Sequence, residues 1–243
     1  MPDTLPITRL LNEWFGGIAA AAMHAAGIPA TAATAIDDAF ALELLVACGL
    51  IVFFIVVRLT LSVENPNPVQ QMAEMVHEFT TSQGEQIIGH GHERFQAYTT
   101  SIVLFILLNN LMGLFPRTVT PTSQPVVPLG LAVLTFLYYN FHGVRVQGPI
   151  GYLKQLAGPL WWLAPLLFPI EVVSHLARMM SLTIRLYANM LASDLLTLIF
   201  FSIFPLLTPV IFLGMHFAVA IIQAYVFMLL TMIYLSMAIS HDH

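Results

Sequence analysis

Long apolar segments separated by short polar ones run through most of this chain, and their lengths predict membrane-spanning α-helices. About 20 consecutive apolar residues suffice for a helix to cross a bilayer. Proline and glycine, which interrupt helices, stand between the segments. The pattern therefore predicts an all-α integral membrane protein with about five membrane helices. These helices are expected over residues 40–61, 95–115, 129–141, 166–204 and 208–240.

The last two segments are longer than a vertical crossing requires. Residues 166–204 and 208–240 each exceed about 30 residues, against about 20 for a helix perpendicular to the membrane. Both helices are therefore expected to be strongly tilted or to run partly along the membrane plane. Pro205 lies between them and Pro209 is the second residue of the later segment, which predicts a turn and an antiparallel hairpin.

Two other regions are not expected to span the membrane, one because it is too polar and one because its side chains are mostly small. Residues 69–89 mix methionine, phenylalanine and isoleucine with glutamate, which is typical of an amphipathic helix lying in the membrane interface. Residues 1–36 are rich in alanine and resemble a signal peptide weakly, since Arg9 is the one basic residue near their start. We interpret residues 1–36 as an extramembrane N-terminal arm, helical around Trp14-Phe15, and residues 37–243 as the membrane domain.

Composition supports the membrane assignment and excludes other classes. The chain has 243 residues, of which 58% are hydrophobic and 9% charged, whereas soluble domains carry about 25% charged residues. A net charge of −5 argues against nucleic acid as a partner, because no basic surface is available to neutralise phosphates. The single cysteine, Cys48, excludes a disulfide framework, and we interpret it as a small core residue.

A few charges interrupt the apolar sequence near its C-terminal end. Arginine keeps its proton at any accessible pH, and a charge at the centre of a membrane helix costs about 2.5–3.5 kcal/mol. Arg185 therefore needs an anionic partner, and such a residue indicates ion movement. The formal charges between Gly158 and Ser240 are Glu171, Arg178, Arg185 and Asp194.

The spacing of the polar residues predicts which of them meet. Asp194 lies about 180° around the helix from Arg185, so the two are not expected to form an ion pair. If the two long helices pack antiparallel, one register brings Asp194 to His216 and Arg185 to Gln223. A carboxylate beside an imidazole makes a plausible proton relay. A polar stripe about 80° wide contains Glu171, Ser174, Arg178, Ser181, Arg185 and Asn189.

Several of these residues also have simpler interpretations. His216 alone would more often be a buried structural histidine, and Gln223 alone would connect two helices. Arg178 either reaches toward an interface or pairs with Glu171. The functional interpretation rests on the combination of these residues rather than on any one of them.

Two other functions compete with ion conduction through a larger assembly. A stand-alone proton-coupled transporter predicts an internal repeat, and the sequence has no visible one. A membrane metalloenzyme needs at least three converging ligands, whereas His175 and His216 are the histidines within the two long helices. No glycine-rich phosphate loop is present, so we expect neither nucleotide hydrolysis by this chain nor a bound cofactor or metal.

One run of residues carries a specific resemblance. The sequence Ser181-Leu-Thr-Ile-Arg185-Leu-Tyr-Ala-Asn189-Met resembles the signature of subunit a of the rotary ATP synthases, the proton-channel stator of the membrane Fo sector. The segments Asn109–Pro116 and Ala224–Ser236 are similar to other helices of that family. The resemblance covers the chain from about Glu64 to its C-terminus.

The resemblance implies a role for each polar residue. Arg185 would be the essential arginine facing a ring of c subunits, with Asn189 supporting that face and Gln223 opposite. Asp194, where family members commonly have glutamate, would line the outer half-channel with His216. The residues implied for the inner half-channel are Glu171 and Ser174.

The resemblance also implies partners and a location. The expected partners are the c-subunit ring, b-type peripheral stalk subunits and the rest of the complex, in a bacterial inner membrane. The distribution of arginine and lysine over the loops weakly places the N-terminus outside and the C-terminus in the cytoplasm. The basic residues expected on the cytoplasmic side are Arg58, Arg94, Arg145 and Lys154.

Overall fold

Every regular element in the described part of the chain is a helix, as the apolar pattern predicts. The computed structural model describes residues 4–25, 27, 29, 31, 34–62, 66–115, 118–157, 164–203 and 208–239. Two 3-10 helices, η1 (Met112–Leu114) and η2 (Pro121–Ser123), follow α4. The α-helices are α1 (Pro6–Ala25), α2 (Asp38–Leu59), α3 (Pro68–Ile87), α4 (Glu93–Leu111), α5 (Val126–Ala157), α6 (Ala164–Ile203) and α7 (Thr208–Ile239).

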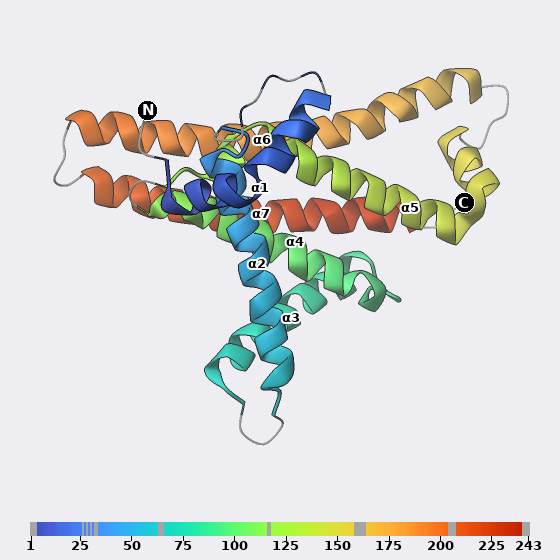
Figure 1. Cartoon of the computed structure of the whole chain (residues 1–243). Coiled ribbons are helices and arrows are strands. Elements are labelled where there is room, and N and C mark those ends of the chain that lie inside the picture. Colours follow the sequence, from blue (N-terminus) through green and yellow to red (C-terminus); the bar gives the residue numbers. More distant parts are fainter. Residues whose placement is uncertain are drawn as a thin grey trace.

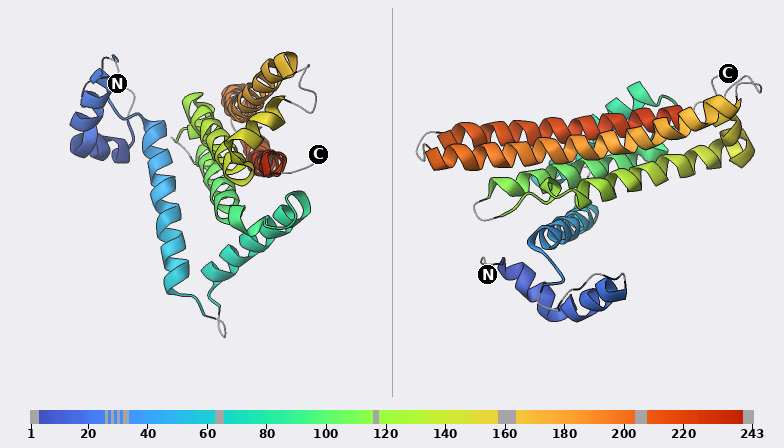
Figure 2. Two further views of the ribbon diagram at one scale, coloured as in Figure 1. Left: turned by 90° about the vertical axis from the view of Figure 1, so that its right-hand side faces the viewer. Right: turned by 90° about the horizontal axis from the view of Figure 1, so that it is seen from above.

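Five of these helices are long and apolar enough to cross a membrane, which confirms the expected number among the described residues. Helices α5, α6 and α7 lie side by side, and α2 crosses their common direction (Figure 1; Figure 2). Helices α6 and α7 run antiparallel and pack along their length, so the expected hairpin is confirmed. The turn predicted at Pro205 lies outside the described residues.

Apolar packing along α6 and α7 fixes the rotation of each helix. Leu182, Leu186 and Met190 of α6 are buried at spacings of four residues, and they join a core with Ala224 and Phe227 of α7. Residues four apart share a helix face, so this face turns the rest of α6 outward. The charged residues Arg185 and Asp194 consequently lie at the edges of the packed face, where each is half-buried.

The third membrane helix differs from its expected range. Residues 129–141 were predicted, but α5 continues to Ala157 and bends at Gly148, where φ is +76°, just before Pro149. Gly143, which follows the expected end and as a glycine is typical of helix ends, lies inside α5 instead, and its missing side chain lets Tyr152 and the backbone of α7 approach. The polar residues beyond it serve packing: Gln147 donates a hydrogen bond to the Ala238 carbonyl at 2.9 Å.

The N-terminal helices agree in most respects with the predictions made from the sequence. The helix expected around Trp14-Phe15 is α1, which is tied to α2 by a hydrogen bond from Thr8 to Asp38 at 2.6 Å. Helix α3 matches the expected amphipathic helix over 69–89 to within two residues. Cys48 was expected in the core, but it lies exposed on the outer face of α2, because α2 is packed on one side only.

Two glycines of α5 allow a matched test of this packing. A Cβ at Gly143 would lie 2.7 Å from the Tyr152 ring and 3.1 Å from the Ala238 carbonyl oxygen, whereas one at Gly130 meets nothing within 4 Å. We expect Gly143→Ala to destabilise the chain by about 1–2 kcal/mol and Gly130→Ala to stabilise it by about 0.5–1 kcal/mol. Thermal unfolding of the purified protein in detergent measures both, and equal midpoints would contradict this packing.

Candidate ion pathway

Helices α6 and α7 bring a carboxylate and an imidazole together, as the antiparallel register predicts. Asp194 Oδ1 lies 3.3 Å from His216 Nδ1. His216 is almost fully buried, while the Asp194 side chain keeps 27% of its surface exposed. The pair therefore has one member inside the protein and one at the edge of a cavity, whose lining includes Thr197, Leu213 and Phe115.

The hydrogen bonds of His216 indicate which of its nitrogens carries hydrogen in the neutral ring. Its Nε2 lies 3.0 Å from the backbone carbonyl of Asn110, and a carbonyl only accepts, so Nε2 carries hydrogen. Its Nδ1 lies 3.0 Å from Ser193 Oγ and faces Asp194. A neutral ring accepts the Ser193 hydroxyl hydrogen at Nδ1, and a protonated ring offers Nδ1–H to Asp194. The nitrogen of His216 that faces Asp194 is therefore the hydrogen-bond acceptor of the neutral ring.

Residues of the α4–α5 connection complete this cluster, and the sequence reasoning missed them. Thr120 donates a hydrogen bond to Asp194 Oδ1 at 2.9 Å. Thr122 donates one to Asn110 Oδ1 at 2.6 Å, and the Asn110 amide lies 3.4 Å from the Ala220 carbonyl. The one signal for them in the sequence is the density of threonines after α4. This cluster consists of Asn110, Thr120, Thr122, Ser193, Asp194 and His216, and we call it the Asp194 cluster.

Gly113 leaves the space that the Asp194 cluster requires. A Cβ at this position would lie 2.0 Å from Thr120 Oγ1 and 3.0 Å from His216 Cε1. Distances below about 3 Å between such atoms do not occur without displacement. The absence of a side chain at Gly113 thus lets the Thr120 hydroxyl reach Asp194.

Arg185 lies one helical turn from a second interhelical contact. Asn189 donates a hydrogen bond to Gln223 Oε1 at 2.8 Å, so Gln223 bonds Asn189 rather than its expected neighbour Arg185. Arg185 is half-buried at the edge of the packed face. Within the described residues, its guanidinium takes part in no hydrogen bond or ion pair. Beside Arg185, Ser181, Ala188 and Ala192 are exposed, which leaves room for another helix to approach.

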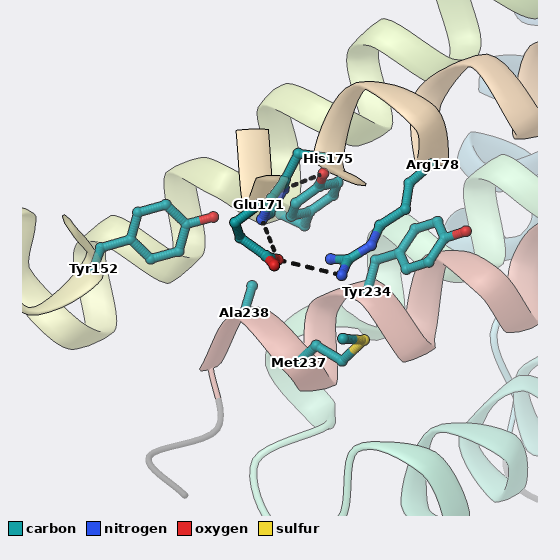
Figure 3. Close-up of a pocket in the computed structure, with 8 residues that line it drawn as sticks. Tyr152, Glu171, His175, Arg178, Tyr234, Met237 and Ala238 are labelled. Carbon is teal, nitrogen blue, oxygen red and sulfur yellow. Dashed lines mark hydrogen bonds and ion pairs between the residues drawn. The ribbon is translucent and has the colours of Figure 1, made fainter. Parts of the chain in front are cut away.

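Near the start of α6, a separate polar cluster lines a cavity of about 60 Å³ between α5, α6 and α7 (Figure 3). Glu171 lies 3.4 Å from Arg178 and 3.5 Å from His175, so Arg178 pairs with Glu171, one of its two expected roles. Ser174, which was expected to act with Glu171, is half-buried on α6 but is not among the residues that line this cavity. The residues lining this cavity, which we call the Glu171 cavity, are Tyr139, Tyr152, Glu171, His175, Arg178, Tyr234, Met237 and Ala238.

The sequence reasoning gave His175 no part in this site. His175 Nδ1 lies 2.9 Å from the Tyr139 hydroxyl of α5. The Arg178 guanidinium carbon lies 5.7 Å from the centre of the Tyr234 ring, a distance at which a cation and an aromatic face attract. No group of three or more metal-ligating side chains converges among the residues that the structure describes.

The arrangement is typical of one class of protein. Two polar clusters lie in a bundle of apolar helices, and the permanently charged Arg185 lies between them along α6. Such clusters inside membrane helices mark ion pathways. The fold and this site define a multi-pass membrane protein with an ion pathway.

Comparison with known proteins identifies the family. The model of the family described as ATP synthase A chain matches residues 40–236. The chain is 47% identical to ATP synthase subunit a of Koribacter versatilis over 244 residues, covering all of both chains. It is 44% identical to the subunit a of Solibacter usitatus, with 83% of this chain and 87% of that one covered.

The chain belongs to the ATP synthase A chain family, the proton-channel stator subunits of the Fo sector. Subunits of this kind are not catalytic. The match extends farther toward the N-terminus than Glu64, where the sequence resemblance began.

The contact at Gly113 yields a prediction about proton transport. Gly113→Ala forces the Thr120 hydroxyl away from Asp194, and Thr120→Ala removes the same hydroxyl. Each is expected to lower ATP-driven proton pumping by about 10-fold, less than the roughly 10²–10⁴-fold that a positioned proton-transfer group contributes, because the carboxylate itself is retained. Pumping is measured in membrane vesicles that carry the whole complex.

The double variant provides the control. If Gly113→Ala acts mainly through Thr120, adding it to Thr120→Ala causes a smaller loss than it does alone, because the oxygen at 2.0 Å is gone and the looser contacts with the His216 ring at 3.0 and 3.1 Å remain. Fully additive losses, or normal pumping in Gly113→Ala alone, would contradict the proposed contact.

Proposed function

We propose that this chain forms two proton half-channels beside a rotating ring of c subunits and thereby couples proton flow to rotation. The observation that supports this most strongly is Arg185, which has no counter-ion among the described residues and lies between the two polar clusters of α6. A permanent charge in apolar surroundings needs an anion. A carboxylate on the rotor supplies that anion from outside the chain.

Each polar cluster serves one half-channel in this proposal. Asp194 and His216 line the outer half-channel and deliver a proton to the rotor carboxylate. Glu171 and Ser174 line the inner half-channel, which receives the proton after the ring has turned. Asn189 and Gln223 hold α6 and α7 together beside Arg185 through their hydrogen bond.

The charges explain why the ring turns. A protonated rotor carboxyl is neutral and faces lipid at low cost, whereas an ionised one is held beside Arg185. The fixed charge of Arg185 also repels protons and so separates the two half-channels. Each proton releases about 2.3 kcal/mol per 100 mV of membrane potential, so several protons are needed for each ATP made on other subunits.

The proposal includes an orientation and a set of partners. The N-terminus lies outside and the C-terminus in the cytoplasm of a bacterial inner membrane, with the b-type peripheral stalk holding the chain against the ring. The positions of the basic residues support this orientation: Arg58 ends α2, and Arg94 and Arg145 lie near helix ends or bends.

Replacement of the central charge tests the half-channel mechanism. Arg185→Ala is expected to abolish ATP-driven proton pumping and to raise passive proton leak, because nothing then separates the two half-channels. Both rates are measured in liposomes that carry the whole complex.

The exposed Arg145 of α5 provides a matched control. Arg145→Ala removes an equal charge away from the clusters and is expected to leave pumping and leak unchanged. Coupled pumping that survives Arg185→Ala would contradict the mechanism.

The carboxylate of Asp194 allows a second test. Asp194→Asn keeps the shape and still accepts the Thr120 hydrogen bond, but an amide does not exchange a proton near neutral pH. We expect pumping to fall by about 10-fold or more, while Asp194→Glu retains a large part of it. Equal activity of the Asn variant and the native chain in a pumping assay would exclude Asp194 from the pathway.

A further inference from the structure

We propose that His175 is the group of the Glu171 cavity that takes up and releases the proton, with Tyr139 as its positioning residue. This inference rests on the proposed function, since it assigns a carrier within the inner half-channel. It gives Glu171 a different task, that of counter-ion to Arg178.

The geometry places His175 between two hydrogen-bonding partners from different helices. Its Nε2 faces Glu171 Oε1 at 3.5 Å on α6, and its Nδ1 meets the Tyr139 hydroxyl at 2.9 Å on α5. The side chain lines the cavity and keeps 13% of its surface exposed. Figure 3 shows the imidazole edge directed toward the Glu171 carboxylate inside the cavity.

Glu171 is poorly suited to carry the proton itself. Its Oε1 lies 3.4 Å from Arg178 Nη2, and arginine stays charged. A protonated Glu171 would leave Arg178 without its carboxylate partner inside a membrane helix, which is costly. The carboxylate is therefore retained as the counter-ion, and the neighbouring imidazole carries the proton.

The other titratable side chains that line the cavity, apart from Glu171 and Arg178, are less suitable. They are Tyr139, Tyr152 and Tyr234, from α5 and α7, and phenols ordinarily ionise near pH 10. Burial raises the pKa of Tyr152 further, which excludes this hydroxyl as a proton acceptor at neutral pH. Imidazole is the one side chain that ordinarily titrates close to neutrality.

Tyr139 keeps a hydrogen bond with Nδ1 of His175 in each protonation state of the ring, whereas the hydrogen bond from Nε2 to Glu171 forms and breaks with the proton. When Tyr139 donates to Nδ1, Nε2–H points to Glu171. When Nδ1–H donates to the Tyr139 oxygen instead, Nε2 is free to form an N–H bond with an incoming proton. The charged ring then donates to both partners. The proton comes from the rotor carboxylic acid, and when the N–H bond breaks it passes to water on the inner side.

Replacement of His175 by glutamine tests this assignment. Glutamine accepts from Tyr139 and donates toward Glu171 but does not titrate. In liposomes carrying the whole complex, His175→Gln is expected to lower proton flux by about 10-fold or more. It should also remove the near-neutral pH dependence of flux measured when pH is varied on the inner side alone. Added imidazole on that side should partly restore the rate.

Two further variants make the test specific. Tyr139→Phe keeps the ring but removes the hydroxyl, and is expected to shift the inner-side pH profile rather than abolish it. Phe136→Leu, a nearby change without a titrating group, should leave the profile unchanged. Unaltered flux and pH profile in His175→Gln would overturn the assignment, as would a native complex without near-neutral inner-side titration.

The outcome is separable from that of the proposed function. If the Arg185→Ala complex loses coupling while the His175→Gln complex conducts protons with an unchanged inner-side pH profile, the half-channel mechanism stands and the proposed role of His175 is wrong. If coupling survives Arg185→Ala, the proposed function itself fails whatever His175 does.

Discussion

A permanent positive charge on an apolar helix is the constraint on which this structure depends. Arg185 remains charged in any protonation state of its surroundings, and the described part of the chain offers it no counter-ion. The nearest polar contact on α6, between Asn189 and Gln223, joins two neutral amides. In the proposed function, a carboxylate of the rotor, outside the chain, offsets the energetic cost of this charge.

The packing of α6 determines where its charged side chains lie. One face carries Leu186 and Met190 into the core with α7, and both are fully buried. Arg185 and Asp194 lie at opposite edges of that face, where the interior meets a surface or cavity. A single helix thus presents the carboxylate of Asp194 to one side and the fixed charge of Arg185 to the other, without direct contact between them.

Much of the fold follows from periodicity and length, but parts of the site depend on contacts distant in sequence. Segment lengths predict the spans, and the register of α6 against α7 predicts the Asp194–His216 contact. The bend of α5 at Gly148 was missed because Gly143, which resembles a helix end, serves close packing instead. The Asn110 carbonyl and the Tyr139 hydroxyl were missed because a backbone group has no sequence signature and a tyrosine 36 residues from His175 has no periodic relation to it.

The claim that the Arg185 face of α6 meets a rotor is tested most directly by disulfide cross-linking. In a Cys48→Ser background, cysteines at Ala188 and Ala192, which are exposed, are each combined with a cysteine beside the carboxylate of the c subunit. A disulfide requires Cα atoms within about 7 Å. The account predicts cross-links from these two positions and none from Leu186→Cys or Met190→Cys on the buried face. Cross-linking from the buried positions, or from none of the four, would contradict it.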